Sequence, residues 1–307
     1  MFYAREDDII AFRKNIERKD RSVTLVYGRR YCGKTSLIQS ATEHFKGLTI
    51  EYLCANSTLE GNIKLFTQVI REALGLTGLY FYGLSEIFEY LGRFDRKVLV
   101  ILDEYQFLRD SAKKGEVDLE LSDIIDNMSD NLRLVICGSD IISMKELLLN
   151  KNPLYGKFTL LLHLSEFDYI DSVRILHNHK DLSTDEKLGI YSVFGGSPYV
   201  LEVIERELDH ISSGDIFKSL VTDILLPDTS PIRLYIENIL LREIRVSYDV
   251  RILSCLRSEG KRYSDIVKDL GYREEGSLDK QLKSLLSMEL IEKKTPVNHE
   301  GDRKKQY

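Results

Sequence analysis

Residues 27–36 read YGRRYCGKTS and lie between an apolar run that predicts a buried strand, 22–26, and a helical pattern, 37–45. A strand, the pattern G-x-x-x-x-G-K-[ST] and a helix, in this order, form the phosphate-binding loop. The glycines let the backbone curl so that N–H groups point at phosphate oxygens, and the helix N-terminus adds partial positive charge. The stretch predicts a nucleotide site at Gly28, Arg29, Arg30, Tyr31, Cys32, Gly33, Lys34, Thr35 and Ser36.

Two side chains of this loop have specific predicted roles. We expect Lys34 to reach the β- and γ-phosphates of ATP and to act in catalysis, and the hydroxyl of Thr35 to ligate magnesium. The alternative is a chance match, which the frequency of glycine makes expected in roughly one chain in a hundred of this size. The strand and the helix on either side favour the functional interpretation.

A second anchor follows about seventy residues downstream, where the apolar run 98–102 ends in the carboxylates Asp103 and Glu104. A run that is apolar at every position is typical of a central parallel strand covered on both faces. Ligands bind at the carboxyl ends of such strands. We therefore predict a Walker B motif, in which Asp103 holds magnesium and Glu104 polarises the attacking water as general base. The alternative is a strand end with ordinary solvated acids.

Three further apolar runs, 48–54, 132–137 and 158–164, complete a set of about five predicted strands. Because helical patterns separate them, we predict an α/β fold with the parallel sheet of a P-loop NTPase. Ser139 follows the run 132–137 and is a candidate catalytic residue, placed to contact the γ-phosphate or the attacking water. Alternatively, Ser139 only caps the predicted helix 141–149.

Helical patterns dominate after residue 166. Between two of them stands the turn 195–198, Gly-Gly-Ser-Pro, in which glycines end one helix and proline suits the first turn of the next. We predict an α/β domain at 1–165 and a helical lid at 166–246. The aromatic cluster 80–82 is predicted to pack in the core or against the lid rather than to stack on a base.

The segment 247–307 shows a third pattern, three short helices followed by the start of a strand at 291–297. This order predicts a winged helix-turn-helix. Residues 248–307 hold 13 Lys/Arg and 11 Asp/Glu, a net charge of +2, which is a weak electrostatic footprint for duplex DNA. The candidate DNA-contacting residues on the third helix are Lys280, Gln281 and Lys283. Solvated charges, or a winged helix that contacts protein, explain them equally well.

The composition is that of a globular protein, with 43% hydrophobic and 30% charged residues among 307. The formal net charge of -6 does not indicate nucleic-acid binding by the chain as a whole. The four cysteines are widely separated, with no metal-ligand spacing. The charged N-terminus does not fit a signal peptide, and no apolar run approaches the roughly 20 residues of a membrane helix. We expect a cytoplasmic protein without a membrane partner.

Taken together, these motifs resemble the archaeal-type P-loop ATPases, which belong with the AAA+ and STAND NTPases and are related to archaeal replication initiators. The resemblance covers nearly the whole chain. It implies that Arg5, in a box that lies against adenine, and Pro198, in the lid motif, contact the nucleotide. At Lys157 the chain departs from the family, which has an arginine there. If that arginine acts in trans as a finger, lysine is a poorer substitute because it lacks the planar fork. The matching segments are 2–6, 28–36, 102–106, 137–139, 143–144, 153–156 and 195–199.

The resemblance implies a magnesium-dependent ATPase that binds ATP and ADP and acts as a nucleotide-driven switch coupled to a winged helix. One alternative is a nucleotide-gated DNA-binding or initiator-like module, and another is a scaffold for a toxin or nuclease effector. The resemblance leaves open whether the protein forms a homo-oligomer. Many family members continue into a nuclease-like domain, and the resemblance of these residues does not by itself support a nuclease activity. Small-molecule kinases share the loop but lack a lid with a winged helix.

Overall fold

The computed structural model describes residues 5–176, 182–208, 210, 216–243, 251–256, 260–272, 275–294 and 307. The chain forms two compact units, Met1–Ile232 and Arg233–Tyr307. The first unit therefore contains the predicted α/β domain and most of the predicted lid. The boundary between the units falls within a helix, 14 residues before the predicted boundary at 246.

The first unit is built on a five-stranded parallel sheet in the order β2-β3-β4-β1-β5, which confirms the predicted fold class. The strands are β1 (Ser22–Tyr27), β2 (Leu48–Leu53), β3 (Val98–Asp103), β4 (Leu132–Gly138) and β5 (Leu160–His163). The central strands β1 and β4 are buried at every position, whereas the edge strand β2 alternates between buried and exposed residues. Both faces of the central strands are therefore covered, as continuous apolar runs require.

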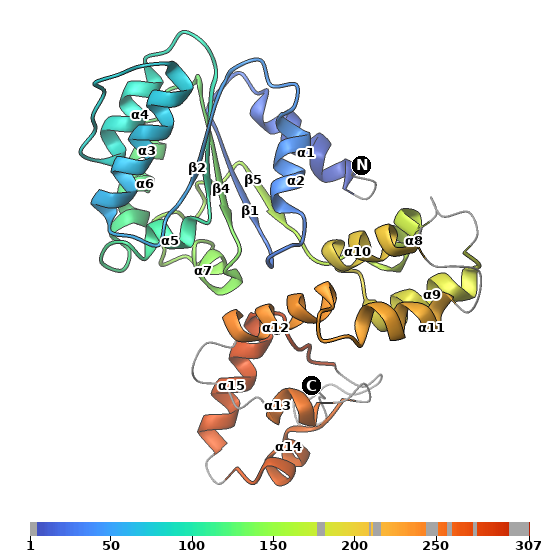
Figure 1. Ribbon diagram of the computed structural model, residues 1–307. Helices are drawn as coiled ribbons and strands as arrows, with labels where there is room; N and C mark the ends of the chain where they lie inside the picture. Colours follow the sequence, from blue (N-terminus) through green and yellow to red (C-terminus); the bar gives the residue numbers. More distant parts are fainter. Residues whose placement is uncertain are drawn as a thin grey trace. The chain divides into compact units, whose positions relative to one another are not determined.

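Two layers of helices cover the sheet (Figure 1). One face packs against α1 (Glu6–Ile16) and α2 (Lys34–Thr42), through side chains such as Phe12 and Leu37. The other face packs against α3 (Leu59–Leu74), α4 (Leu84–Gly92) and α6 (Glu116–Asn127). Two short helices, α5 (Tyr105–Arg109) and α7 (Ile141–Glu146), follow β3 and β4 directly. The sheet thus fixes the carboxyl ends of β1, β3 and β4 side by side.

The aromatic cluster between α3 and α4 differs from its prediction. Tyr80 is 67% exposed and Tyr82 is 86% exposed, so the prediction of core or lid packing is wrong for both. Phe81 alone packs partly against the core. The guanidinium of Arg71 covers the Tyr80 ring at 4.8 Å from its centroid. The side chains of three consecutive residues cannot all point toward one core, and here only Phe81 does so.

The predicted lid is a set of helices that belongs to the first unit. Its elements are α8 (Tyr169–Leu176), α9 (Thr184–Phe194), α10 (Pro198–Leu208), α11 (Ile216–Ser219) and a π-helical segment, η1 (Leu220–Leu225). A capping box at Ser183 and Glu186 begins α9, since each side chain bonds the other's backbone N–H. The last two elements form one continuous stretch that changes from α to π geometry after Ser219.

The second unit has its own apolar core. Its helices are α12 (Pro231–Glu243), which begins just before the boundary, α13 (Arg251–Cys255), α14 (Tyr263–Leu270) and α15 (Glu275–Ser287). The core residues Ile252, Ile266 and Leu278 are fully buried. The backbone of Tyr307 pairs with that of Lys261 through hydrogen bonds of 2.9 and 3.0 Å. The helical order agrees with the prediction, but the predicted wing at 291–297 lies partly outside the described residues, so the winged helix stays a prediction.

Candidate active site

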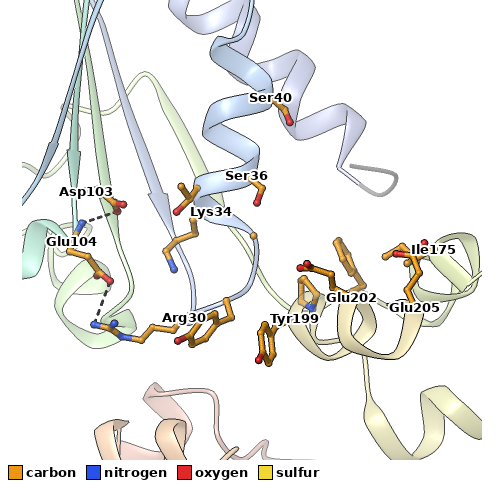
Figure 2. Close-up of a pocket in the computed structure, with 15 residues that line it drawn as sticks. Arg30, Lys34, Ser36, Ser40, Asp103, Glu104, Ile175, Tyr199, Glu202 and Glu205 are labelled. Atoms are coloured by element: carbon orange, nitrogen blue, oxygen red, sulfur yellow. Dashed lines mark hydrogen bonds and ion pairs between the residues drawn. The ribbon is translucent and has the colours of Figure 1, made fainter. Parts of the chain in front are cut away.

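A pocket of about 650 Å³ lies between the carboxyl edge of the sheet and the lid (Figure 2). The sheet, the loop before α2 and α2 itself contribute one wall, and α8, α10 and the segment before α8 contribute the other. The described lining residues are Arg30, Tyr31, Gly33, Lys34, Thr35, Ser36, Ser40, Asp103 and Glu104 on the first wall, with Phe167, Ile175, Pro198, Tyr199, Glu202 and Glu205 on the second. Most of the predicted loop residues therefore face a cavity.

The loop at 28–33 is held tightly against the sheet. A Cβ atom on Gly28 would lie 2.1 Å from the carbonyl oxygen of Leu164, so only glycine fits there. Tyr31 adopts a positive φ of 62°, and Gly33, with φ 90°, precedes the first turn of α2. The Nζ atom of Lys34 donates to the carbonyl oxygens of Gly28 at 2.8 Å and Arg29 at 2.7 Å. These contacts curl the loop around its own lysine.

The two carboxylates at the end of β3 have different surroundings. Asp103 accepts a hydrogen bond from the backbone N–H of Glu104 at 2.8 Å. Glu104 adopts a left-handed conformation, with φ 52° and ψ 44°, which turns its side chain away from the direction of the strand. Backbone strain of this kind is common at functional sites.

Glu104 is the centre of a polar cluster. It accepts hydrogen bonds from Ser139 Oγ at 2.5 Å and from Gln106 Nε2, and its Oε1 atom lies 3.4 Å from Nη2 of Arg30. Burial opposes its ionisation, but these bonds and the charges of Arg30 and Lys34 outweigh burial and hold the pKa of Glu104 below its ordinary value. The carboxylate is therefore ionised at neutral pH and able to accept a proton.

Ser139 lies at the carboxyl end of β4, buried beside Glu104 rather than in the pocket wall. The alternative that it caps the next helix is wrong, because the N-cap of α7 is Asp140, whose side chain accepts from the Ser143 N–H at 3.0 Å. Gln106 Nε2 also lies 3.2 Å from Ser139 Oγ. The serine therefore belongs to the polar cluster around Glu104.

Arg5 is not among the residues that line the pocket, although the resemblance implies contact with the nucleotide. It is buried and donates to the carbonyl oxygens of Cys32, at 3.3 Å, and of Ser165. Its guanidinium lies 5.0 Å from the centroid of the Phe167 ring, and Phe167 does line the pocket. Arg5 thus connects the loop, the segment after β5 and the start of the lid, from a position outside the pocket lining.

Three other predicted loop residues are also absent from the lining. Gly28 is covered by Leu164, and Arg29 lies 3.6 Å from Glu166 in an ion pair. Cys32 is buried, and burial raises the pKa of its thiol, so it stays protonated and unreactive.

Several lining residues were not predicted as site residues. Ser40 follows Ser36 by one helical turn, and both lie on the side of α2 toward the lid (Figure 2). Glu202 and Glu205 are spaced three residues apart on α10, a spacing that places side chains on one helix face. The helical spacing of Ser40 from Ser36, and of Glu202 from Glu205, could have placed each pair on one helix face. Phe167 and Ile175 carried no sequence signal.

The pocket has donors suited to a hard cation. The hydroxyl of Thr35 and the carboxylate of Asp103 both line it, and oxygen donors of this kind fit Mg²⁺. Among the described residues, no group of three or more His, Cys, Asp or Glu side chains forms a separate metal site.

The remaining predicted residues lie outside the pocket lining. The Nζ atom of Lys157 is paired with both carboxylate oxygens of Asp126, at 2.5 and 2.6 Å. On α15, Lys280 and Lys283 are exposed, and Lys283 pairs with Asp279 at 2.6 Å. Gln281 is half-buried and donates to the Tyr272 hydroxyl at 3.1 Å, so it is less available to a partner than its neighbours.

A parallel sheet, a glycine-rich loop before α2 and acids at the end of β3 define a P-loop NTPase. More specifically, the chain belongs to the family described as the ATPase domain predominantly from Archaea, whose profile matches residues 2–204. The matched residues therefore belong to an ATPase domain. None of the described helices has the length and apolar character needed to cross a membrane.

Comparison with known proteins gives relatives along nearly the whole chain. An uncharacterized protein of Methanocaldococcus jannaschii is 25% identical over 314 residues, covering 99% of this chain but 65% of that protein. A Walker-type ATPase of Pyrococcus abyssi is similar in structure, with a TM-score of 0.70, 21% identity and coverage of 99% of this chain and 93% of that one. The Aeropyrum pernix ORC2 protein, in ADPNP–ADP complexes, has a TM-score of 0.65, 16% identity and coverage of 94% and 87%. At these identities the solved structures show a shared fold.

Proposed function

We propose that the protein is a magnesium-dependent ATPase of AAA+/STAND type that works as a nucleotide-driven switch. The observation that carries this proposal is the cluster around Glu104, in which an ionised carboxylate stands beside Ser139 and opposite the phosphate-binding loop. A general base for hydrolysis needs that charge state and that position.

Each residue of the site has a role in this proposal. Lys34 and the loop N–H groups bind the β- and γ-phosphates, and Glu104 takes a proton from the attacking water. Ser139 donates a hydrogen bond to Glu104 and, through that carboxylate, senses the γ-phosphate. Thr35 and Asp103 would hold Mg²⁺, which neutralises phosphate charge when bound. Pro198 and the other lid residues that line the pocket face the rest of the nucleotide.

Two substitutions test the proposed ATPase. Lys34→Ala should abolish nucleotide binding, because the phosphates lose their cation. Glu104→Gln should preserve ATP binding and slow hydrolysis by about 10²- to 10⁴-fold, because the amide cannot accept the proton. Binding is measured by calorimetry and hydrolysis by phosphate release. A Glu104→Gln variant that hydrolyses ATP at the parental rate would exclude Glu104 as the base.

The switch requires the lid to respond to the nucleotide. The Tyr31 ring on the loop and the Tyr199 ring on α10 lie 5.3 Å apart between centroids, so the loop and the lid meet at the pocket. Changes in the loop can therefore move α10, and we propose that this motion passes from the α/β domain (1–165) through the lid (166–246) to the C-terminal segment (247–307). A toxin or nuclease effector is a further partner class for that segment.

A second candidate function is duplex DNA binding through the C-terminal unit. It is favoured by the exposed cations Lys280 and Lys283 on α15, the third helix of a helix-turn-helix order. Lys280→Glu combined with Lys283→Glu should weaken DNA binding and reduce its salt dependence, because phosphate contacts release counterions. Electrophoretic shifts at several salt concentrations, with and without ATP, are the measurement. Absence of any shift for the parent protein would exclude this function.

A further inference from the structure

Arg30 belongs to the phosphate-binding loop, yet its side chain reaches the acid at the end of β3. Its Nη2 atom lies 3.4 Å from Oε1 of Glu104, and both residues line the pocket (Figure 2). The side chain of Arg30 is 30% exposed and that of Glu104 is 16% exposed. The pair is therefore accessible from the pocket. A single ion-pair contact at 3.4 Å is weaker than the paired hydrogen bonds that a guanidinium can make, so a stronger partner could replace it.

Arg30 carries the one guanidinium among the described residues that line the pocket. Among the described lining residues the other cation is Lys34, whose Nζ atom donates to two carbonyl oxygens of its own loop. Lys157, at the position where the family resemblance implies an arginine, is outside the lining and is paired with Asp126. A positive charge for the γ-phosphate, beyond Lys34, is thus available within this chain from Arg30.

Building on the proposed ATPase, we propose that Arg30 is a catalytic residue that exchanges Glu104 for the γ-phosphate of ATP. A phosphate accepts paired hydrogen bonds from a guanidinium and carries more charge than one carboxylate, so it is the stronger partner. Glu104 must lie within hydrogen-bond reach of the attacking water. A guanidinium already beside Glu104 is therefore close to the phosphorus that this water attacks.

The exchange acts on the reaction in two ways. It frees Glu104 to accept a proton from the water while the water oxygen bonds to the γ-phosphorus. The bond between that phosphorus and the β,γ-bridging oxygen breaks, and the products are ADP and inorganic phosphate. The guanidinium meanwhile stabilises charge on the equatorial oxygens of the transferred group. The arginine acts within its own chain, and hydrolysis needs no cation from a second copy.

The test uses Arg30→Ala and Arg30→Lys variants of the full chain. Calorimetry gives their affinities for ADP and for a non-hydrolysable ATP analogue, and single-turnover assays give the hydrolysis rate. We expect Arg30→Ala to weaken analogue binding about tenfold more than ADP binding, and to slow hydrolysis about 10²-fold or more. Arg30→Lys should recover part of the analogue affinity, because it keeps the charge without the fork.

Two variants serve as matched controls. Arg93→Ala removes an exposed arginine directly after α4 that pairs with Glu89, and Lys157→Ala removes the lysine paired with Asp126. Both should keep parental ADP-to-analogue ratios and hydrolysis rates. If Lys157→Ala slows hydrolysis and Arg30→Ala does not, the cation comes from Lys157 and the inference is overturned.

The remaining outcomes separate this inference from the proposed ATPase. Equal losses of ADP and analogue affinity in Arg30→Ala, or no loss of either, overturn the role of Arg30 while leaving an ATPase that depends on Lys34. If the parent protein binds no nucleotide, both proposals fail. If it binds nucleotide but turns over slowly, the ratio of analogue to ADP affinity still decides the role of Arg30. If Arg30→Ala does not fold, Arg30→Lys decides it by the same ratio.

Discussion

At the scale of single residues, Arg133 shows how a charged side chain is accommodated in a buried strand. It lies within β4 and is 1% exposed. Its guanidinium donates to the carbonyl oxygens of Ile16 at 2.7 Å, Asp130 at 2.7 Å and Leu132 at 2.8 Å, and also to that of Arg18. Two of these oxygens belong to the end of α1 and the turn after it. Arg133 therefore fastens α1 to the sheet, and burial lowers its pKa.

We expect Arg133→Met to destabilise the protein by about 2–4 kcal/mol, because several buried carbonyl groups lose their donor while the apolar volume is retained. Urea unfolding followed by circular dichroism measures the change. Arg93→Ala, which removes an arginine whose side chain is 72% exposed, should cost less than about 0.5 kcal/mol. Equal stability of Arg133→Met and the parent would mean that these bonds contribute nothing net.

At the scale of elements, the turn between α9 and α10 sets the position of the lid. A Cβ atom on Gly196 would lie 1.8 Å from the carbonyl oxygen of Phe167, so the two backbones meet too closely for any side chain. The Phe167 N–H donates to the Gly196 carbonyl oxygen at 2.8 Å. Phe167 makes this contact, Tyr199 follows the turn in the chain, and both line the pocket, so the turn determines the shape of one wall.

Gly196→Ala should therefore displace α10 and weaken nucleotide binding by about tenfold or more, with a loss of stability of about 1–3 kcal/mol. The matched control is Gly189→Ala on α9, where a Cβ atom would make ordinary contact with Phe217 at 3.4 Å. That variant should be neutral or up to about 1 kcal/mol more stable, because alanine favours a helix. Calorimetric binding and thermal unfolding compare the two. Equal nucleotide affinities would show that the turn does not shape the site.

At the scale of the whole molecule, the chain has two units with separate apolar cores. The core of the first unit includes Leu134 of β4, and that of the second includes Ile266 of α14, both with 0% exposure. The described residues that line the pocket all lie in the first unit. Units of this kind unfold separately, in two transitions, unless the contact between them is large.

We predict two transitions in scanning calorimetry. ATP at about 100 times its Kd should stabilise the first unit by about 2.7 kcal/mol and leave the second transition in place. Ile266→Ala should reduce the free energy of unfolding of the second unit only, by about 2–4 kcal/mol, and Leu134→Ala that of the first unit only. If ATP and Ile266→Ala both move one shared transition, the units unfold together.

The sequence by itself determined the class of the fold and the chemical centre of the site. Residues 27–36 and the pair Asp103–Glu104 are local motifs, recognisable because each needs a fixed spacing along one loop or one strand. The five strands were predictable because apolar runs record burial on both faces. Ser139 was predictable from its place after β4, since parallel strands end at one edge.

Only the tertiary structure decided which residues complete the pocket. Arg5 lies outside the pocket lining although it belongs to a recognised motif, whereas Phe167, which belongs to none, lines the pocket. The contact of Arg30 with Glu104 joins two segments 74 residues apart, and that of Gly196 with Phe167 depends on backbone packing. Periodicity and spacing describe one element at a time. Contacts between elements depend on how their surfaces fit, and no local pattern encodes that fit.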